Sequence, residues 1–144
     1  MGQQQLLLII LGVIVVGIAV AVGITMFNDS AVSANRDAVT NDLVNLAARA
    51  QQYYRRPTAL GGGNASFVNL TVAGGMKLLT KTTLASWTNG NGIYTIKTAG
   101  TGGASAEVDF QGQGTETGND GTNKVTVVMQ VWADSAKVDV SQTN

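Results

Sequence analysis

The 144-residue sequence contains no histidine, no cysteine and one proline, Pro57. Without imidazole or thiolate groups, the commonest neutral-pH general base, the cysteine nucleophile and the usual zinc ligands are missing. Chemistry would therefore depend on carboxylates, lysine, tyrosine or hydroxyl groups. The lack of cysteine also means that no disulfide forms, so cysteine usage does not indicate the redox compartment.

A surplus of charge is missing as well. Nine basic and nine acidic residues give a formal net charge of zero. Nucleic-acid-binding proteins usually carry a basic excess or a basic face, because neutralising phosphates supplies most of their affinity. We therefore expect no nucleic-acid partner. The length predicts one domain with a modest core.

Charge is absent from the N-terminal region, where the first charged residue is Asp29 and the first basic one is Arg36. From Leu6 to Ile24 the sequence LLLIILGVIVVGIAVAVGI has 19 residues without a charged or polar side chain. At a helical rise of about 1.5 Å per residue, this segment spans roughly 28 Å, close to the hydrocarbon thickness of a bilayer. The segment therefore predicts a helix that can sit in a membrane.

Two simpler interpretations of this segment are a cleavable secretory signal and an ordinary single-pass anchor. A signal would fit the small residues at 19–21, but no basic residue precedes the apolar run, which is also longer than usual. Lysine or arginine close to the span normally orients an anchor. The flank MGQQQ carries neither.

The helical pattern continues beyond the apolar run, which favours a third interpretation. Apolar residues recur at helical spacing in one stripe that predicts packing against a globular head: Val32, Val39, Leu43, Leu46, Ala50 and Tyr53. The opposite surface is predicted to carry Arg36, Asp37, Asp42, Asn45 and Arg49. Pro57 and the glycine run at 61–63 mark the end, so we expect one helix of about 50 residues.

A segment that is apolar on every face must be buried on every face, by lipid before assembly or by identical helices afterwards. The predicted filament-core residues are Leu6, Leu7, Leu8, Ile9, Ile10, Leu11, Val13, Ile14, Val15, Val16, Ile18, Val20, Val22, Ile24 and Phe27. Gly12, Gly17 and Gly23 are candidate weak points, because glycine costs about 1 kcal/mol relative to alanine in a helix. They equally permit close helix packing.

After Pro57 the composition shifts to glycine, threonine, asparagine and valine, which favours strands and turns. Two Asn-Gly pairs at 89–92, followed by alternating residues, predict a hairpin. Further strands are expected at 106–110, 124–133 and 136–140, whereas residues 76–79 give no clear signal. The expected fold class is α+β, with a three- to five-stranded, mostly antiparallel sheet laid on the helical stripe. Trp87 and Trp132 are expected to serve packing.

No catalytic, cofactor or metal site is predicted. In the expected loop at 111–124, Glu116, Asn119 and Asp120, with Asp109 nearby, offer oxygen ligands of the kind that Ca²⁺ takes. The ordered D-x-D-x-D-G pattern is missing, however, which favours a solvated turn. An enzyme would need a carboxylate pair converging in a pocket, and three of the nine acidic residues lie on the predicted helix. We therefore expect no enzymatic activity.

An uncharged apolar helix, the amphipathic continuation NDLVNLAARAQQYYRRP, a glycine-rich connection and a β-rich C-terminal part follow one another along the chain. In this organisation the whole chain resembles type IV pilins and related pseudopilins. The resemblance implies a structural subunit with residues 1–29 in the membrane before assembly and in the filament core afterwards. Residues 30–144 would form the head, with an amphipathic helix at 30–56 and a β-rich part at 64–144.

The resemblance also implies partners and a location. The partners are identical subunits in a helical homopolymer, the inner membrane, an assembly machinery and a leader peptidase. The location is an extracellular filament at the cell surface, drawn from an inner-membrane pool. Alternatives are a minor pilin or pseudopilin of a secretion or DNA-uptake machine, and a single-pass membrane-anchored β-rich domain.

The sequence departs from the family at three points. Gln5 stands where family members usually carry glutamate, if Met1 is the mature first residue. Gln5 offers only a neutral hydrogen bond to a neighbour's N-terminal amine. No basic leader ending in glycine is visible, and the helix-breaking proline of the apolar half is absent. We expect the mature chain to start at Met1 or Gln3.

Overall fold

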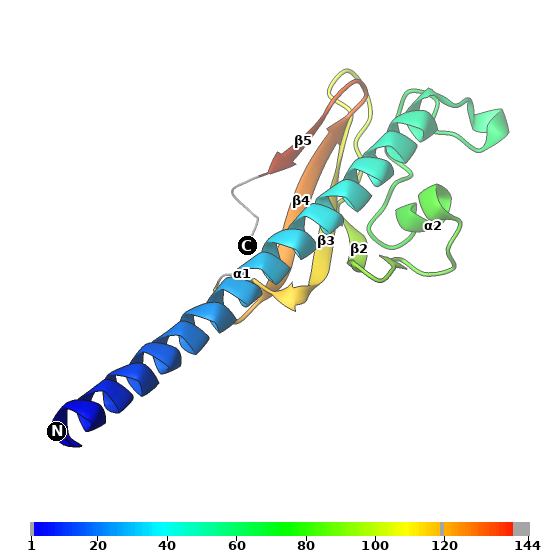
Figure 1. Cartoon of the computed structure of the whole chain (residues 1–144). Helices are drawn as coiled ribbons and strands as arrows, with labels where there is room; N and C mark the ends of the chain where they lie inside the picture. Colours follow the sequence, from blue (N-terminus) through cyan, green and yellow to red (C-terminus); the bar gives the residue numbers. More distant parts are fainter. Residues whose placement is uncertain (1, 119, 140–144) are drawn as a thin grey trace.

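The computed structural model describes residues 2–118 and 120–139, and consists of one long helix laid on one sheet. Helix α1 (Gly2–Arg55) passes across the sheet with its C-terminal half, while its N-terminal half extends away from the head (Figure 1). This α+β arrangement, with an apolar N-terminal helix on a small antiparallel sheet, confirms the predicted fold class.

Helix α1 has 54 residues and is continuous through Gly12, Gly17 and Gly23. A Cβ atom added at any of these glycines would meet nothing within 4 Å in the single chain. Their role as weak points or as packing positions therefore stays a prediction. The helix ends just before Pro57, because proline lacks the N–H that continues the helical ladder.

The connection after α1 folds back onto the end of the helix. Gly63 N donates a hydrogen bond to the carbonyl of Tyr53, and Ala65 N donates one to the carbonyl of Tyr54, both at 2.8 Å. These bonds satisfy carbonyl groups that have no partner within the helix. The connection contains a short 3-10 helix, η1 (Thr58–Leu60), and helix α2 (Gly75–Thr80), which covers the segment that gave no sequence signal.

The sheet is a meander of five antiparallel strands in the order β1-β2-β3-β4-β5. Its strands are β1 (Trp87–Thr88), β2 (Gly92–Thr98), β3 (Glu107–Thr117), β4 (Lys124–Trp132) and β5 (Ala136–Asp139). The predicted hairpin is confirmed, since Thr88 pairs with Ile93 across the turn. The two C-terminal strands lie where expected, and position 140 of the last one falls outside the described residues.

The core lies between α1 and one face of the sheet. The six residues of the predicted stripe, Val32, Val39, Leu43, Leu46, Ala50 and Tyr53, are all buried. Ala47, which is not part of the predicted stripe, is also buried. The sheet contributes alternating side chains, as half-buried strands do: Tyr94, Ile96, Val108, Phe110, Val125, Val127, Met129 and Val131.

Strand β3 is much longer than predicted, which corrects the expected loop at 111–124. The strand continues to Thr117, so the turn to β4 occupies only 118–123. A Cβ atom at Gly112 would lie 2.5 Å from Cγ1 of Val39 and 3.1 Å from the ring of Tyr94. Glycine is present there because the side chains of Val39 and Tyr94 fill the space that a Cβ atom would need, and not because the strand ends.

Asp42 lies on a different side of the helix from the one predicted. The sequence predicts Asp42 on the outer polar surface, but its carboxylate reaches the β1–β2 turn and the hydroxyl of Tyr94. By contrast, Asp37, Asn45 and Arg49 are exposed as expected. The helical stripe is bordered by polar residues, and a border residue can face the neighbouring turn when that turn supplies donors.

Candidate assembly surface

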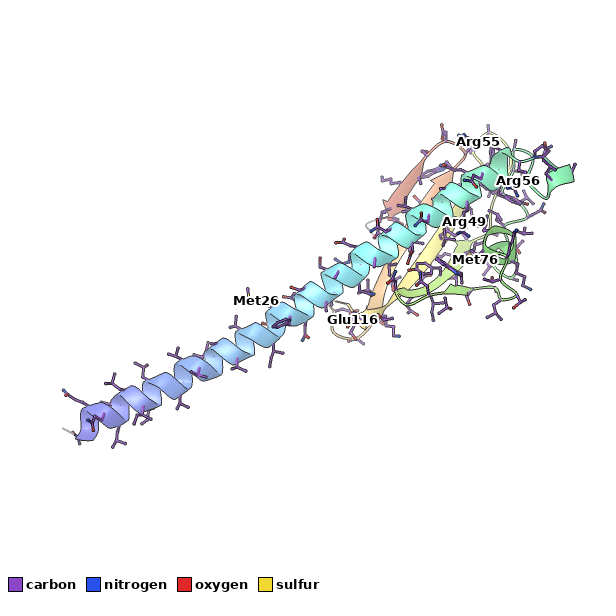
Figure 2. All side chains as sticks on the ribbon, turned by 45° about the vertical axis from the view of Figure 1, so that its right-hand side comes forward. Met26, Arg49, Arg55, Arg56, Met76 and Glu116 are labelled. Carbon is purple, nitrogen blue, oxygen red and sulfur yellow. The ribbon has the colours of Figure 1, made fainter. Side chains whose placement is uncertain are left out.

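The N-terminal half of α1 is an apolar surface that none of the residues described by the structure covers. All fifteen predicted filament-core residues are exposed, from 51% at Val22 to 79% at Phe27, and Met26 is exposed as well. Figure 2 shows their side chains projecting on all sides of the helix, with Met26 near the end of this region. We call residues 6–27 the apolar shaft.

The exposed apolar area is too large for a chain that works alone in water. Fully burying one leucine, isoleucine, valine or phenylalanine side chain contributes about 1.5–3 kcal/mol. Fifteen such side chains left in water therefore forgo stabilisation on the order of tens of kcal/mol. The net stability of a whole domain is only about 5–15 kcal/mol. The apolar shaft must therefore be covered by lipid or by other protein.

The shaft has the length and composition of a membrane span. Among residues 2–118 and 120–139, the most apolar 18-residue stretch of α1 has no buried residue. A helix of this kind near the N-terminus is typical of membrane association or of a signal sequence.

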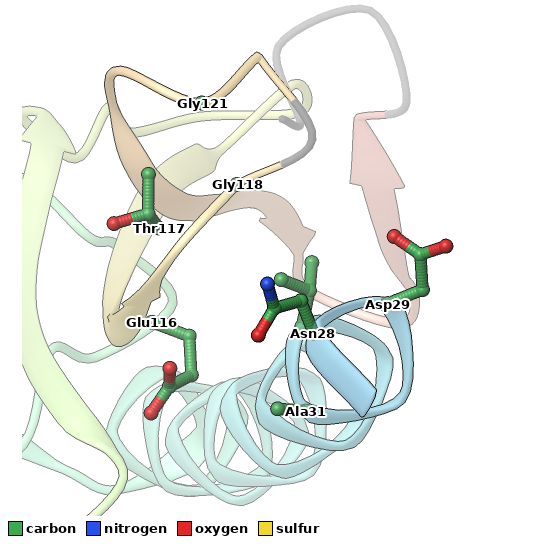
Figure 3. A pocket seen from close by; sticks show the side chains of 8 residues that line it. Asn28, Asp29, Ala31, Glu116, Thr117, Gly118 and Gly121 are labelled. Carbon is green, nitrogen blue, oxygen red and sulfur yellow. The ribbon is translucent and has the colours of Figure 1, made fainter. Parts of the chain in front are cut away.

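The shaft joins the head at a polar boundary. A pocket of about 460 Å³ lies between α1 and the end of β3, and Figure 3 shows Asn28 and Asp29 from α1 and Glu116 from β3 around it. Asn35, about two turns after Asn28 on α1, donates to the carbonyl of Asn91 at 3.1 Å and accepts from Glu116 N at 3.4 Å. These bonds fix α1 to the sheet just where it leaves the head.

A carboxylate clip holds α1 to the β1–β2 turn further into the head. Oδ2 of Asp42 accepts hydrogen bonds from Oη of Tyr94 (2.6 Å), Nδ2 of Asn89 (2.8 Å) and Nδ2 of Asn91 (2.9 Å). Oδ1 of Asn89 in turn accepts from the backbone N–H groups of Asn91 and Gly92. We call Asp42, Asn89, Asn91 and Tyr94 the Asp42 clip.

The clip changes the acidity of its two titratable groups. Partial burial raises the pKa of the Asp42 carboxyl, but the hydrogen bonds from Tyr94, Asn91 and Asn89 together bring that pKa below its ordinary value. Burial, assisted by the Asp42 carboxylate, raises the pKa of the Tyr94 phenol. Asp42 therefore stays ionised and Tyr94 stays protonated at neutral pH, and the bonds of the clip persist.

The acidic residues of the expected loop do not converge. Asp109 pairs with Gln130 within the sheet, seven residues along β3 from Glu116, which corresponds to roughly 23 Å. Oδ1 and Oδ2 of Asp120 accept bonds from the backbone and side chain of Asn123, which lower the pKa of Asp120. Asn119 lies outside the described residues. Within residues 2–118 and 120–139, no three acidic side chains gather as metal ligands would.

The two tryptophans pack within the head. The ring of Trp87 lies 5.0 Å from the ring of Tyr94, next to the Asp42 clip. Nε1 of Trp132 donates a hydrogen bond to Oε2 of Glu107 at 3.1 Å. Both side chains thus join neighbouring strands of the sheet.

Comparisons of the chain with protein-family models, with curated proteins and with solved structures found no match. The chemistry of the apolar shaft and of the head is therefore the basis for assigning a function.

Proposed function

We propose that this chain is a structural subunit that polymerises through its N-terminal helix into an extracellular filament of the type IV pilus kind. The observation that carries the proposal is the apolar shaft, which is exposed on every face and continuous with a helix buried in the head on one face only. Identical shafts packed side by side bury all of these faces at once.

The junction of shaft and head supports a packing role for the helix. Neither glycine nor proline occurs in α1 between Gly23 and its end at Arg55, so the helix enters the head without a natural hinge. Val32 is the first buried residue of the stripe, only five positions after Phe27. The head therefore has a defined direction relative to the shaft, as a regular polymer requires.

The same helix is consistent with subunits that are held in the membrane before assembly, because the shaft is long and apolar enough to cross a bilayer. The contrasting candidate, a head held by a single-pass anchor, is favoured by this same observation. A minor pilin or pseudopilin would share the fold and differ in copy number.

Substitution of Val16, near the middle of the shaft, distinguishes the filament proposal from the single-pass-anchor candidate. Lysine at this position should block filament formation, because an unpaired charge in a dry helical core costs several kcal/mol. Membrane retention should weaken less, because insertion of a central lysine costs only about 2.5–3.5 kcal/mol, which the other apolar residues offset. Val16→Leu is the matched control at the same position, and Lys97→Glu is a control on the head surface.

The assay measures each variant in the membrane fraction and in the sheared filament fraction. We expect Val16→Lys to give membrane-held, unassembled subunits and both controls to give normal filaments. Normal filament yield from Val16→Lys would reject the filament core and leave the plain anchor. N-terminal sequencing of the purified protein adds a second check, since a mature chain starting after Ala21 would restore the signal-peptide interpretation.

A further inference from the structure

The charges of the head are segregated along the chain. No acidic residue occurs between Asp42 and Glu107, and this stretch contains six basic residues: Arg49, Arg55, Arg56, Lys77, Lys81 and Lys97. Figure 2 places Arg49, Arg55 and Arg56 at the end of the head that lies farthest from the shaft. The zero net charge of the whole chain therefore conceals a long stretch of the head, between Asp42 and Glu107, whose charged residues are all basic.

Three of these cations line one pocket. Arg49 of α1 and Arg56, the residue just after the end of α1, meet Lys81 around a pocket of about 260 Å³ that also touches Tyr53 and Leu79. Lys81 follows α2 in a left-handed conformation (φ 56°), and its N–H donates to the carbonyl of Lys77 at 3.1 Å. We call Arg49, Arg56 and Lys81 the basic pocket.

The basic pocket favours an anionic occupant. Like charges held close together repel one another, and an anion between them removes the repulsion. Nη1 of Arg49 donates to the carbonyl of Leu79 at 3.5 Å, a neutral group that leaves its charge in place. Leu78, which also lines this pocket, is half exposed, so the rim offers apolar area as well.

The opposite end of the head carries complementary groups. Asp29 and Glu116 line the pocket between α1 and β3 from opposite sides (Figure 3). No lysine or arginine is among its described lining residues, whereas Arg36 lines a neighbouring pocket together with Asp29. Asp29 precedes the last residue of α1, Arg55, by 26 residues, which corresponds to roughly 40 Å along the axis, and Arg56 follows directly. The Debye length at physiological salt is about 8 Å, so the two ends do not neutralise each other within one chain.

We propose that the basic pocket of one chain receives the Asp29 and Glu116 carboxylates of a second copy displaced along the helix axis. The two surfaces differ, so the contact is head-to-tail and can repeat without closing, which is the requirement for a filament. Opposite charges also set the register of the contact, because a shifted neighbour would bring like charges together. This inference rests on the proposed filament function.

Charge exchange in the full-length chain tests the contact. The double variant Arg49→Glu with Arg56→Glu should lower sheared filament yield about tenfold, since attractive pairs become repulsive ones. The double variant Asp29→Arg with Glu116→Arg should do the same. Combining all four substitutions should restore the yield, which a misfolded head would not do. Lys137→Glu, an exposed charge reversal on β5, is the matched control and should assemble normally.

The outcomes separate this proposal from the filament proposal. Absence of filaments from the unmodified chain rejects both. Filaments that form normally with Arg49→Glu and Arg56→Glu, or a fourfold variant that fails to recover, overturn the charge contact alone. A last measurement, co-sedimentation of filaments with polyphosphate, tests whether the basic pocket binds a free polyanion instead. If the arginine variant assembles normally but no longer binds polyphosphate, the pocket serves a free polyanion and the second-copy proposal is wrong.

Discussion

Removing the carboxylate of Asp42 should destabilise the head more than any other change to the polar residues of α1. In the structure a single oxygen of Asp42 accepts three hydrogen bonds, one from Tyr94 and two from the asparagines of the β1–β2 turn. Asp42→Ala removes all three bonds. It also leaves the hydroxyl of Tyr94, a fully buried residue, without its acceptor.

The magnitude follows from these contacts. A hydrogen bond to a charged group contributes about 1.5–3 kcal/mol, and a buried donor left unpaired costs about 1–3 kcal/mol. The asparagine amides are only partly buried, so water replaces much of what they lose. We therefore expect Asp42→Ala to lower the free energy of unfolding by about 2–4 kcal/mol. Tyr94→Phe removes one donor and keeps the two amides, and should lower it by about 1 kcal/mol.

Denaturant unfolding of the detergent-solubilised full chain, followed by tryptophan fluorescence, measures this change. Trp87 is a local reporter, because the centroid of its ring lies 5.0 Å from that of Tyr94, with the two rings tilted by 34°. Asp37→Ala is the matched control, since Asp37 is exposed on the same helix and surface substitutions usually stay within about 0.5 kcal/mol. An Asp42→Ala chain as stable as the Asp37→Ala chain would refute the clip as a stabilising contact.

Two further predictions concern the same interface. Because the folded-state pKa of Asp42 is lowered, its contribution is present above the unfolded pKa of about 3.9 and is lost as pH falls through the folded value. Acid titration should therefore destabilise the wild-type chain below about pH 4 more than Asp42→Asn, and equal acid sensitivity would contradict this. Gly112→Val should destabilise the head by about 1–3 kcal/mol or more, because its side chain meets Val39. Thermal unfolding against Gly90→Ala, a glycine with open space, checks this, and equal melting temperatures would oppose it.

The long helix and its buried stripe could be predicted because their signals are local. An uninterrupted apolar run and a heptad-like spacing of Val32, Val39 and Leu46 indicate helix and core face without any knowledge of partners. The Asn-Gly turn before β2 is equally local, since only a few residue types tolerate the backbone of a tight hairpin. These features alone were enough for the fold class.

The features that could not be predicted from the sequence depend on contacts between segments that are distant along the chain. Gly112 and Gly114 suggested a loop, yet they lie in β3 beneath α1, and a Cβ atom at Gly112 would collide with Val39. Asp42 has the same charge as exposed Asp37, and only the position of the β1–β2 turn distinguishes them. The basic pocket joins residues 49 and 56, at the end of α1, to residue 81, which lies beyond η1 and α2 in the connection. A run of sequence without acidic residues was a visible signal of its charge.

The two kinds of contact in the proposed filament have different physical tasks. Burial of the apolar shaft supplies most of the favourable free energy, but it is non-directional and allows neighbouring helices to slide or rotate. Exposed ion pairs contribute little energy, yet they distinguish a correct register from a shifted one. Because α1 is one unbroken helix, a head placed by its basic pocket also places its shaft. Helix α1 thus carries the register that the ion pairs between heads determine into the filament core, where the apolar contacts alone determine no register.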